Sequence, residues 1–118
     1  MIVAGVGCRR GCPAEAIVAL VQRAARQAGV QVDALAAPEF KRDEPGLHGA
    51  AAALGLAIRF VDSAALGAAQ ADAPTRSTAS LHATGFASIA EAAALAASGG
   101  RILLPRTGSG PATCAIAG

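Results

Sequence analysis

The sequence predicts a three-layer α/β protein, in which helices cover both faces of a mostly parallel five-stranded sheet with an antiparallel edge strand. Two observations support this class. Strand-like and helix-like segments alternate along most of the chain, and only a short loop joins the last two strand-like segments. A chain of 118 residues buries one core well and two poorly, so we expect a single domain over residues 1–118.

The first strand and helix have clear signals. Residues 2–6 form a short apolar run typical of a buried strand. After them, Pro13 stands where a helix often opens, apolar residues recur at helical spacing, and Gly29 marks the end. Residues 30–36 predict the second strand, so the chain begins with a strand, a helix and a strand.

The middle of the chain repeats this alternation. A polar loop leads to Pro45, which opens a helix that Gly55 ends. Residues 56–61 predict the third strand. Asp62 has the character of an N-cap, so we expect a short helix from there to residue 69.

The last third begins with residues 70–85, which have no apolar period and predict a long connection without regular structure. Ser88 and Glu91 have the spacing of a capping box, which predicts a helix to about residue 98. Residues 101–104 and 112–116 predict two final strands joined as an antiparallel hairpin. For the strand order we expect 3-2-1-4-5, which puts the loop after the first strand at a topological switch point, where such sheets bind ligands.

The loop after the first strand predicts an anion site. Gly5, Gly7 and Gly11 form G-x-G-x-x-x-G between a strand and a helix. Glycines let backbone amides approach an anion, and a helix N-terminus adds partial positive charge. Arg9 and Arg10 add two guanidinium forks that match carboxylate or phosphate groups. We expect both arginines to bind the ligand.

Two other chemistries compete for this loop. A nicotinamide cofactor is disfavoured because the spacing differs from the dinucleotide motif and the predicted second strand ends without an acidic residue. Metal or redox chemistry is disfavoured because Cys8, Cys12 and Cys114 lack the spacing of zinc or disulfide-exchange motifs. We expect small, buried or half-buried reduced thiols, and neither a metal nor a cofactor.

Composition narrows the partners. The formal net charge is only +2, and the chain has no Trp or Tyr, so we expect no nucleic-acid partner. The longest apolar stretch, residues 50–58, is far shorter than the roughly 20 residues of a membrane span. No secretory signal is present at the start. We therefore expect a soluble cytoplasmic protein without a membrane partner.

Four blocks in order carry a family resemblance. They are G-x-G-C-R-R-G in the first loop, K-x-x-E-x-G-L at residues 41–47, residues 84–95 with E-A-A-A-L, and a closing hairpin that ends T-C-A-I-A. With these blocks, the chain resembles the CobE/CbiG C-terminal family of cobalamin (vitamin B12) biosynthesis. The resemblance covers essentially the whole chain. Members often carry a lysine near the start of the closing hairpin, where this chain has Arg106.

The resemblance implies that the ligand is a precorrin or a hydrogenobyrinic-acid-like tetrapyrrole, whose rim of carboxylates suits paired arginines. It implies a carrier or accessory role in the aerobic pathway, with other pathway enzymes as possible partners. Two alternatives remain open. One is an enzyme related to cobalt-precorrin-5A hydrolase, which opens a lactone, and the other is a ligand-free interaction subunit of a pathway enzyme.

Candidate ligand-binding residues come from the loop motif and the family blocks, and no catalytic residue is predicted. They are Gly7, Cys8, Arg9, Arg10, Gly11, Lys41, Glu44, Thr84, Gly85, Arg106 and Thr107. Ser109 and Thr113 are weaker candidates for contacts with the carboxylate rim. His82 is a weaker candidate for a ligand or general base, because a lone histidine in a loop is usually just solvated.

Overall fold

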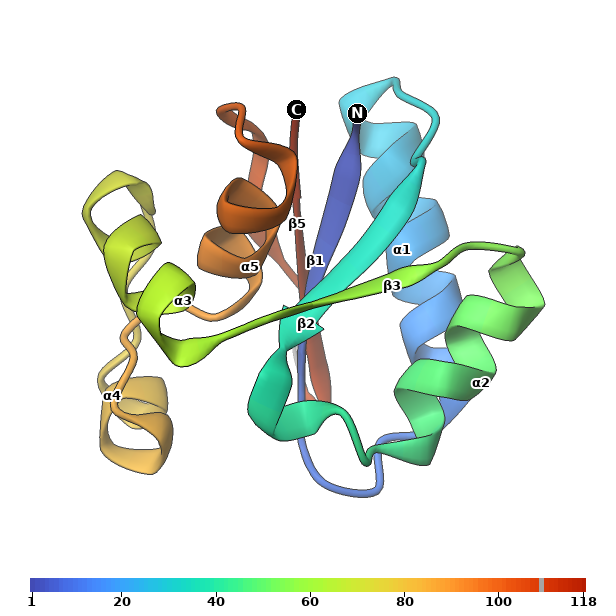
Figure 1. The fold of residues 1–118 in the computed structure, drawn as a ribbon. Coiled ribbons are helices and arrows are strands. Elements are labelled where there is room, and N and C mark those ends of the chain that lie inside the picture. The colour runs from blue at the N-terminus through green and yellow to red at the C-terminus, as the bar shows by residue number, and fades with distance from the viewer. Residues whose placement is uncertain (109) are drawn as a thin grey trace.

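Five strands form one sheet in the order β3-β2-β1-β5-β4 in the computed structural model, which describes residues 1–108 and 110–118 (Figure 1). The strands are β1 (Val3–Cys8), β2 (Ala34–Pro38), β3 (Ile58–Val61), β4 (Ile102–Thr107) and β5 (Ala112–Ala117). The helices are α1 (Ala14–Ala28), α2 (Pro45–Leu54), α3 (Ser63–Ala69), α4 (Thr78–Thr84) and α5 (Ala90–Ser98). Two short 3₁₀ helices are η1 (Glu39–Lys41) and η2 (Gln70–Asp72).

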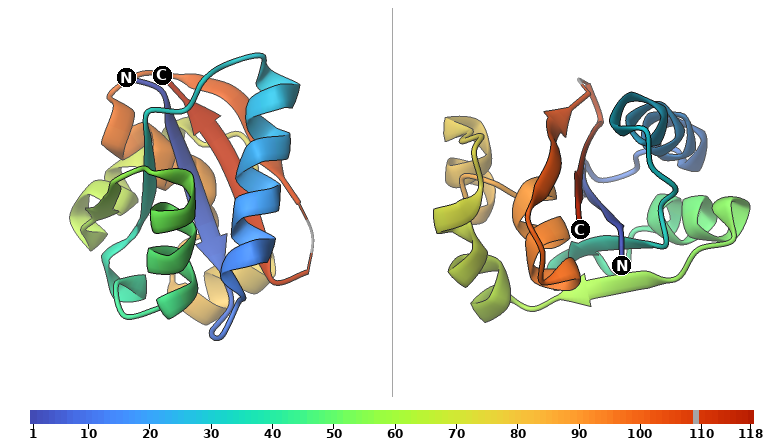
Figure 2. Two further views of the ribbon diagram at one scale, coloured as in Figure 1. Left: turned by 90° about the vertical axis from the view of Figure 1, so that its right-hand side faces the viewer. Right: turned by 90° about the horizontal axis from the view of Figure 1, so that it is seen from above.

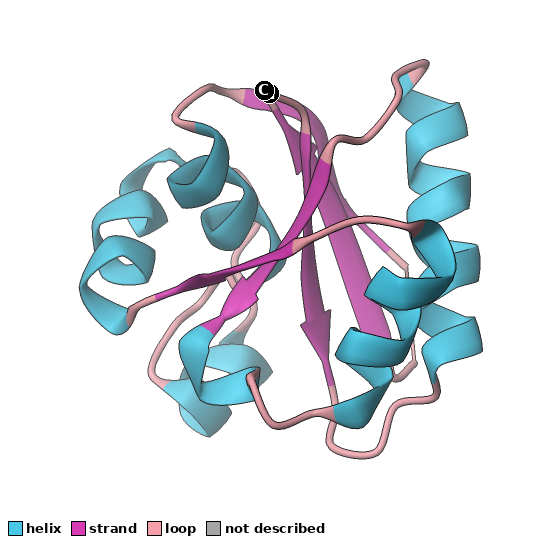
Figure 3. Ribbon diagram, turned by 45° about the vertical axis from the view of Figure 1, so that its right-hand side comes forward, coloured by secondary structure: helices cyan, strands magenta, loops and turns pink. Residues whose placement is uncertain are grey.

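Helices cover both faces of this sheet, which confirms the predicted three-layer class (Figures 2 and 3). One face carries α1 and α2, whose apolar sides share a core cluster with the sheet. The opposite face carries α3 and α5, which pack in a second cluster. None of the described helices is long and apolar enough to cross a bilayer.

The predicted strand order is correct in placing β1 at the centre and wrong in its last two positions. β1, β2 and β3 are parallel, and β5 pairs antiparallel with both β1 and β4. The antiparallel strand is therefore internal, and β4 forms the edge. The reason is composition: β5 is almost wholly buried, whereas β4 contains Pro105, which lacks the N–H that a central strand needs.

Helix ends follow the predicted signals, and strand boundaries differ. Gly29 and Gly55 end α1 and α2 in the left-handed conformation, and the Asp62 carboxylate accepts the Ala65 N–H at 2.8 Å. β2 begins at Ala34 rather than at residue 30, because pairing starts opposite Val3, where β1 itself begins. Periodicity thus predicts an element better than it predicts where pairing starts.

Residues 70–85 are not the unstructured connection that the sequence predicts. They contain η2 and α4, and α4 begins at an N-cap, Ser77, whose hydroxyl accepts the Ser80 N–H at 3.1 Å. Gly85 ends α4 with φ of 82°. No residue of α4 is buried, so the helix lacks the apolar period from which helices are predicted.

The predicted capping box at α5 is wrong. Ile89 is the N-cap residue and makes no side-chain capping bond. Glu91 is only 1% exposed, and its carboxylate accepts the backbone N–H groups of Thr75 and Arg106 instead. A capping-box spacing considers only neighbouring residues. Here the backbone N–H groups of two distant segments bind the Glu91 carboxylate in place of the N-terminus of its own helix.

Gly5 sets how closely α5 lies on the sheet. A Cβ atom at Gly5 would overlap the carbonyl oxygen of Ala90 and lie 2.8 Å from the backbone nitrogen of Ala94. These neighbours are backbone atoms that cannot turn aside. The first glycine of the loop motif is therefore a packing residue under α5.

We predict that Gly5→Ala lowers the free energy of unfolding by about 3 kcal/mol, because the added methyl group must push α5 off β1. Gly67→Ala is the matched control: its Cβ meets Phe86 at an ordinary 3.7 Å, so helix propensity should raise stability by about 0.5–1 kcal/mol. Urea unfolding followed by circular dichroism measures both. Equal stability of G5A and the wild type would contradict the close approach.

Candidate ligand-binding cavity

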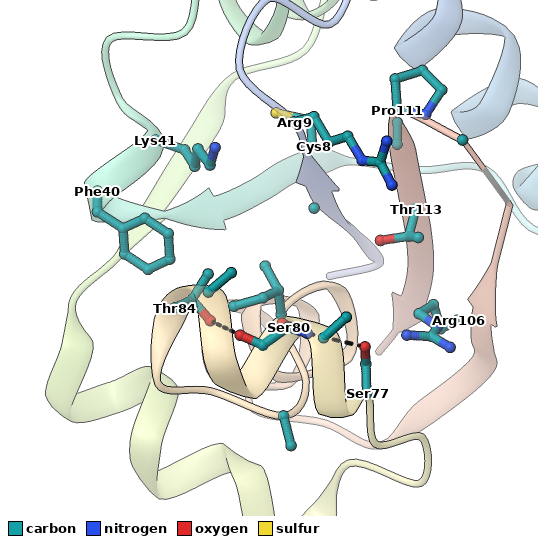
Figure 4. A pocket seen from close by; sticks show the side chains of 17 residues that line it. Cys8, Arg9, Phe40, Lys41, Ser77, Ser80, Thr84, Arg106, Pro111 and Thr113 are labelled. Atoms are coloured by element: carbon teal, nitrogen blue, oxygen red, sulfur yellow. Dashed lines mark hydrogen bonds between the residues drawn. The ribbon is translucent and has the colours of Figure 1, made fainter.

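A cavity of about 440 Å³ lies at the carboxyl ends of β1 and β2 (Figure 4). This edge is the topological switch point between β1 and β5, where the sequence predicts a ligand site. Its walls come from the end of β1, from η1, from α4 with the residues that follow it, and from the β4–β5 hairpin. The described lining residues used below are Gly7, Cys8, Arg9, Phe40, Lys41, Ser77, Ala79, Ser80, Ala83, Thr84, Ala87, Ile89, Arg106, Pro111 and Thr113.

Three cations line this cavity from three separate segments. Arg9 follows β1, Lys41 ends η1, and Arg106 lies on β4. No Asp, Glu or His side chain is among the described residues that line it. Within residues 1–108 and 110–118, the one ion pair joins Arg42 to Glu39, so none of the three cavity cations is held in an ion pair. The cavity is therefore suited to an anion.

Much of the remaining lining is apolar. It consists of alanines on and after α4, Ile89 and the ring of Phe40, which lies beside Lys41 and is 48% exposed (Figure 4). Phe40 lies parallel to Phe86, with ring centroids 6.4 Å apart. A lining that combines three cations with apolar side chains favours a ligand that has an apolar body and anionic groups at its edge.

Hydroxyl groups of α4 face the cavity but mainly hold their own turn. Thr84 Oγ1 donates to the carbonyl of Ser80 at 2.7 Å, and the Ser77 hydroxyl accepts the Ser80 N–H (Figure 4). Ser80 Oγ in turn donates to the carbonyl of Phe86 at 2.8 Å. Thr113 presents its hydroxyl from β5 on the other side. These bonds shape α4 as a wall more than they offer free donors.

The backbone amides of the opening loop are used within the protein. The Arg9 N–H donates to the Pro111 carbonyl at 2.8 Å, and the Gly11 N–H donates to Glu44 Oε2 at 3.0 Å. Glu44 thus occupies a position that the sequence assigns to an anionic ligand. Side chains rather than these two amides remain to hold an anion.

The structure brings together only part of the predicted residue set. Gly7, Cys8, Arg9, Lys41, Thr84 and Arg106 line the cavity, as does the weaker candidate Thr113. Others do not line it: Arg10, Gly11, Glu44, Gly85, Thr107 and His82. Ser109 lies outside the described residues. Arg10 is exposed one residue further along the loop. Of the two loop arginines expected to bind the ligand, only Arg9 therefore lines the cavity.

Several lining residues were missed by the sequence analysis. Phe40, Ser77, Ser80 and Ile89 line the cavity without belonging to a predicted motif. Phe40 carried a detectable signal, because it is the one large apolar side chain in a polar loop beside Lys41. The serines carried none, because their position depends on α4, which the sequence does not predict.

The three cysteines are small buried or half-buried thiols, as predicted. Cys12 and Cys114 are buried, Cys8 is half-buried, and all three are free. Burial raises the pKa of Cys8 to about 11, while nearby Lys41 lowers it to a smaller extent. Among the described residues, no group of three His, Cys, Asp or Glu side chains is placed to hold a metal ion.

Together, fold and cavity define a three-layer α/β protein with a cationic ligand cavity at its switch point. A family model described as Cobalamin synthesis G C-terminus matches residues 2–117. The chain therefore belongs to this family, and it is a protein of cobalamin biosynthesis.

Similar proteins agree with this assignment. Protein CobE from a Sinorhizobium species is 33% identical over 122 residues, which span 99% of this chain and 79% of that protein. The crystal structure of a CobE, described as a protein from the cobalamin (vitamin B12) biosynthetic pathway, is 39% identical with a TM-score of 0.90, over 99% of this chain and 89% of that one. The cobalamin biosynthesis protein chiG from Agrobacterium tumefaciens is 46% identical with a TM-score of 0.79, over 99% and 97%.

We predict that Cys8 reacts slowly despite lining a cavity. Raising its pKa from 9.0 to about 11 lowers the thiolate fraction roughly 100-fold at pH 8, and the thiolate is the reactive form. Iodoacetamide should therefore alkylate Cys8 about 100-fold more slowly in the native protein than in urea, with the native rate rising up to about pH 11. Peptide mass spectrometry reads the rates. Native alkylation at the unfolded rate would contradict the raised pKa.

Proposed function

We propose that the cavity binds a precorrin or related corrinoid intermediate, and that the protein carries this intermediate or hands it to an enzyme of the aerobic pathway. One observation carries the proposal: among the described residues, Arg9, Lys41 and Arg106 converge on one cavity that has no acidic side chain in its lining, and none of the three forms an ion pair. Carboxylates on the rim of a tetrapyrrole supply the missing negative charge. Three free thiols support a reducing, cytoplasmic location.

Cavity size supports a carrier. A volume of about 440 Å³ falls within the roughly 300–1,000 Å³ of small-molecule sites. A tetrapyrrole with its peripheral acids is larger than this, so the cavity would enclose one edge of the ring and leave the rest accessible. A carrier needs this arrangement, because the receiving enzyme must contact the ligand before it is released.

The lining residues favour binding over catalysis. Opening a lactone with water requires a general base positioned at the reacting group. The described lining contains neither a carboxylate nor a histidine, and burial raises the pKa of the Cys8 thiol away from neutrality. The described lining therefore offers charge and shape to a ligand, without a carboxylate or an imidazole to act as the base for the hydrolase alternative.

A titration with hydrogenobyrinic acid and neighbouring precorrins tests the carrier proposal. We expect saturable changes in the visible spectrum and recovery of the ligand with unchanged mass after elution. A changed mass would replace the carrier by an enzyme. Absence of binding would overturn the proposal and favour the interaction subunit, which would then be sought as a stable complex with a pathway enzyme.

We predict that Arg9→Ala raises the Kd for the bound tetrapyrrole by about tenfold to a hundredfold, as expected for the loss of a charge-assisted hydrogen bond in a partly enclosed site. Arg10→Ala is the matched control, because it removes the same charge one residue away and outside the cavity. It should leave the Kd nearly unchanged. Equal losses in both variants would point to general electrostatics instead of the cavity.

A further inference from the structure

Glu91 is a buried carboxylate that the proposed ligand contacts do not use. Its Oε1 accepts the Thr75 N–H at 2.8 Å and the Ser88 hydroxyl at 3.4 Å, while its Oε2 accepts the Arg106 N–H at 2.9 Å. No ion pair to Glu91 occurs among the described residues. One carboxylate therefore joins the start of α5 to two segments that are distant in the sequence, one at Thr75 and one at Arg106.

The first segment leads directly into α4, the wall of the cavity opposite Arg9. Thr75 lies two residues before Ser77, the N-cap of α4. Because α4 buries none of its own residues, few apolar contacts fix its position. Hydrogen bonds hold its two ends instead, including one from the Ser77 N–H to the Ala87 carbonyl at 2.8 Å and the bond from Thr75 to Glu91.

The second segment carries a cavity cation. The pairing of β4 with β5 shifts register between Leu104 and Thr107, so the β4 ladder is interrupted around Arg106. Glu91 Oε2 accepts the Arg106 amide inside this interruption. That bond fixes the backbone from which the Arg106 side chain reaches the cavity.

We propose that Glu91 is the positioning residue of the cavity: one carboxylate holds the α4 wall through Oε1 and the Arg106 strand through Oε2, so the two walls keep their spacing or lose it together. Glu91 is buried and is not among the residues that line the cavity. Its effect on binding rests on the proposed function. Its effect on the two walls is independent of any ligand.

Glu91→Gln tests this assignment with little change in shape. A glutamine offers one acceptor oxygen and turns an N–H₂ donor toward the other backbone N–H, so one wall loses its bond. The other wall keeps its bond only to a neutral amide oxygen, which is a weaker acceptor than a carboxylate oxygen. In hydrogen–deuterium exchange without ligand, we expect amides of residues 75–88 and 102–107 to exchange about tenfold faster or more, with α1 and β1 unchanged. With hydrogenobyrinic acid as probe, we expect the Kd to rise by a similar factor although all three cations are present.

Asp62→Ala separates positioning from general stability. It removes the carboxylate that caps α3, outside the cavity, and so lowers global stability without touching either wall. We expect its melting temperature to fall while the Kd and the exchange of residues 75–88 stay at wild-type values. Unchanged exchange in E91Q, or a uniform rise across α1 and β1, would overturn the positioning role.

A second test uses the wild-type protein and therefore does not depend on whether the E91Q variant folds. In low concentrations of urea, exchange at residues 75–88 and 102–107 should accelerate together and before that of β1, because one carboxylate secures both segments. Opening of the two segments at different urea concentrations would overturn the inference. If the wild type shows no binding of hydrogenobyrinic acid but its two segments open together, the carrier proposal fails and the role of Glu91 stands.

Discussion

The close approach of α5 to β1 at Gly5 determines where the cavity lies. Backbone meets backbone there, because a side chain at Gly5 would overlap the Ala90 carbonyl. With α5 seated this closely, its start lies over the end of β1, and the Ile89 side chain packs against Gly7, where a Cβ atom would lie 3.3 Å from it. The same placement of α5 brings the Glu91 carboxylate within hydrogen-bond distance of the Thr75 and Arg106 backbone N–H groups. A glycine that looks like part of an anion loop therefore acts through helix packing.

A second constraint connects the opening loop to the start of α2. Glu44 accepts the Gly11 N–H, and a Cβ atom at Gly46 would overlap the carbonyl oxygen of Cys12. Two residues of the K-x-x-E-x-G-L block thus hold the loop, while its lysine, Lys41, faces the cavity. The spacing of the block is the spacing needed to fasten the loop and present a cation at the same time.

Sequence reasoning predicted what local patterns determine. Apolar runs and stop signals predicted the class, the central position of β1 and most helix ends, and the arginines of the opening loop pointed to the edge of the sheet at which the cavity lies. It failed where tertiary contacts determine the structure. The buried strand β5, rather than β4, pairs with β1, and α4 was not predicted because it has no buried apolar face. Arg9 and Arg10 are indistinguishable in sequence, and only the path of the loop puts one of them in the cavity.

The arrangement of charge also explains why the cavity needs a firm frame. Three like charges around one cavity repel each other, and repulsion is strongest when no anion is bound. Flexible walls would relieve this repulsion by moving apart, which would change the spacing of the three cations. A buried carboxylate that holds two walls by backbone N–H groups resists this motion without entering the cavity, so the cations stay free for the ligand. If the protein acts as the carrier that we propose, partial enclosure of the ligand would also help its release to an enzyme.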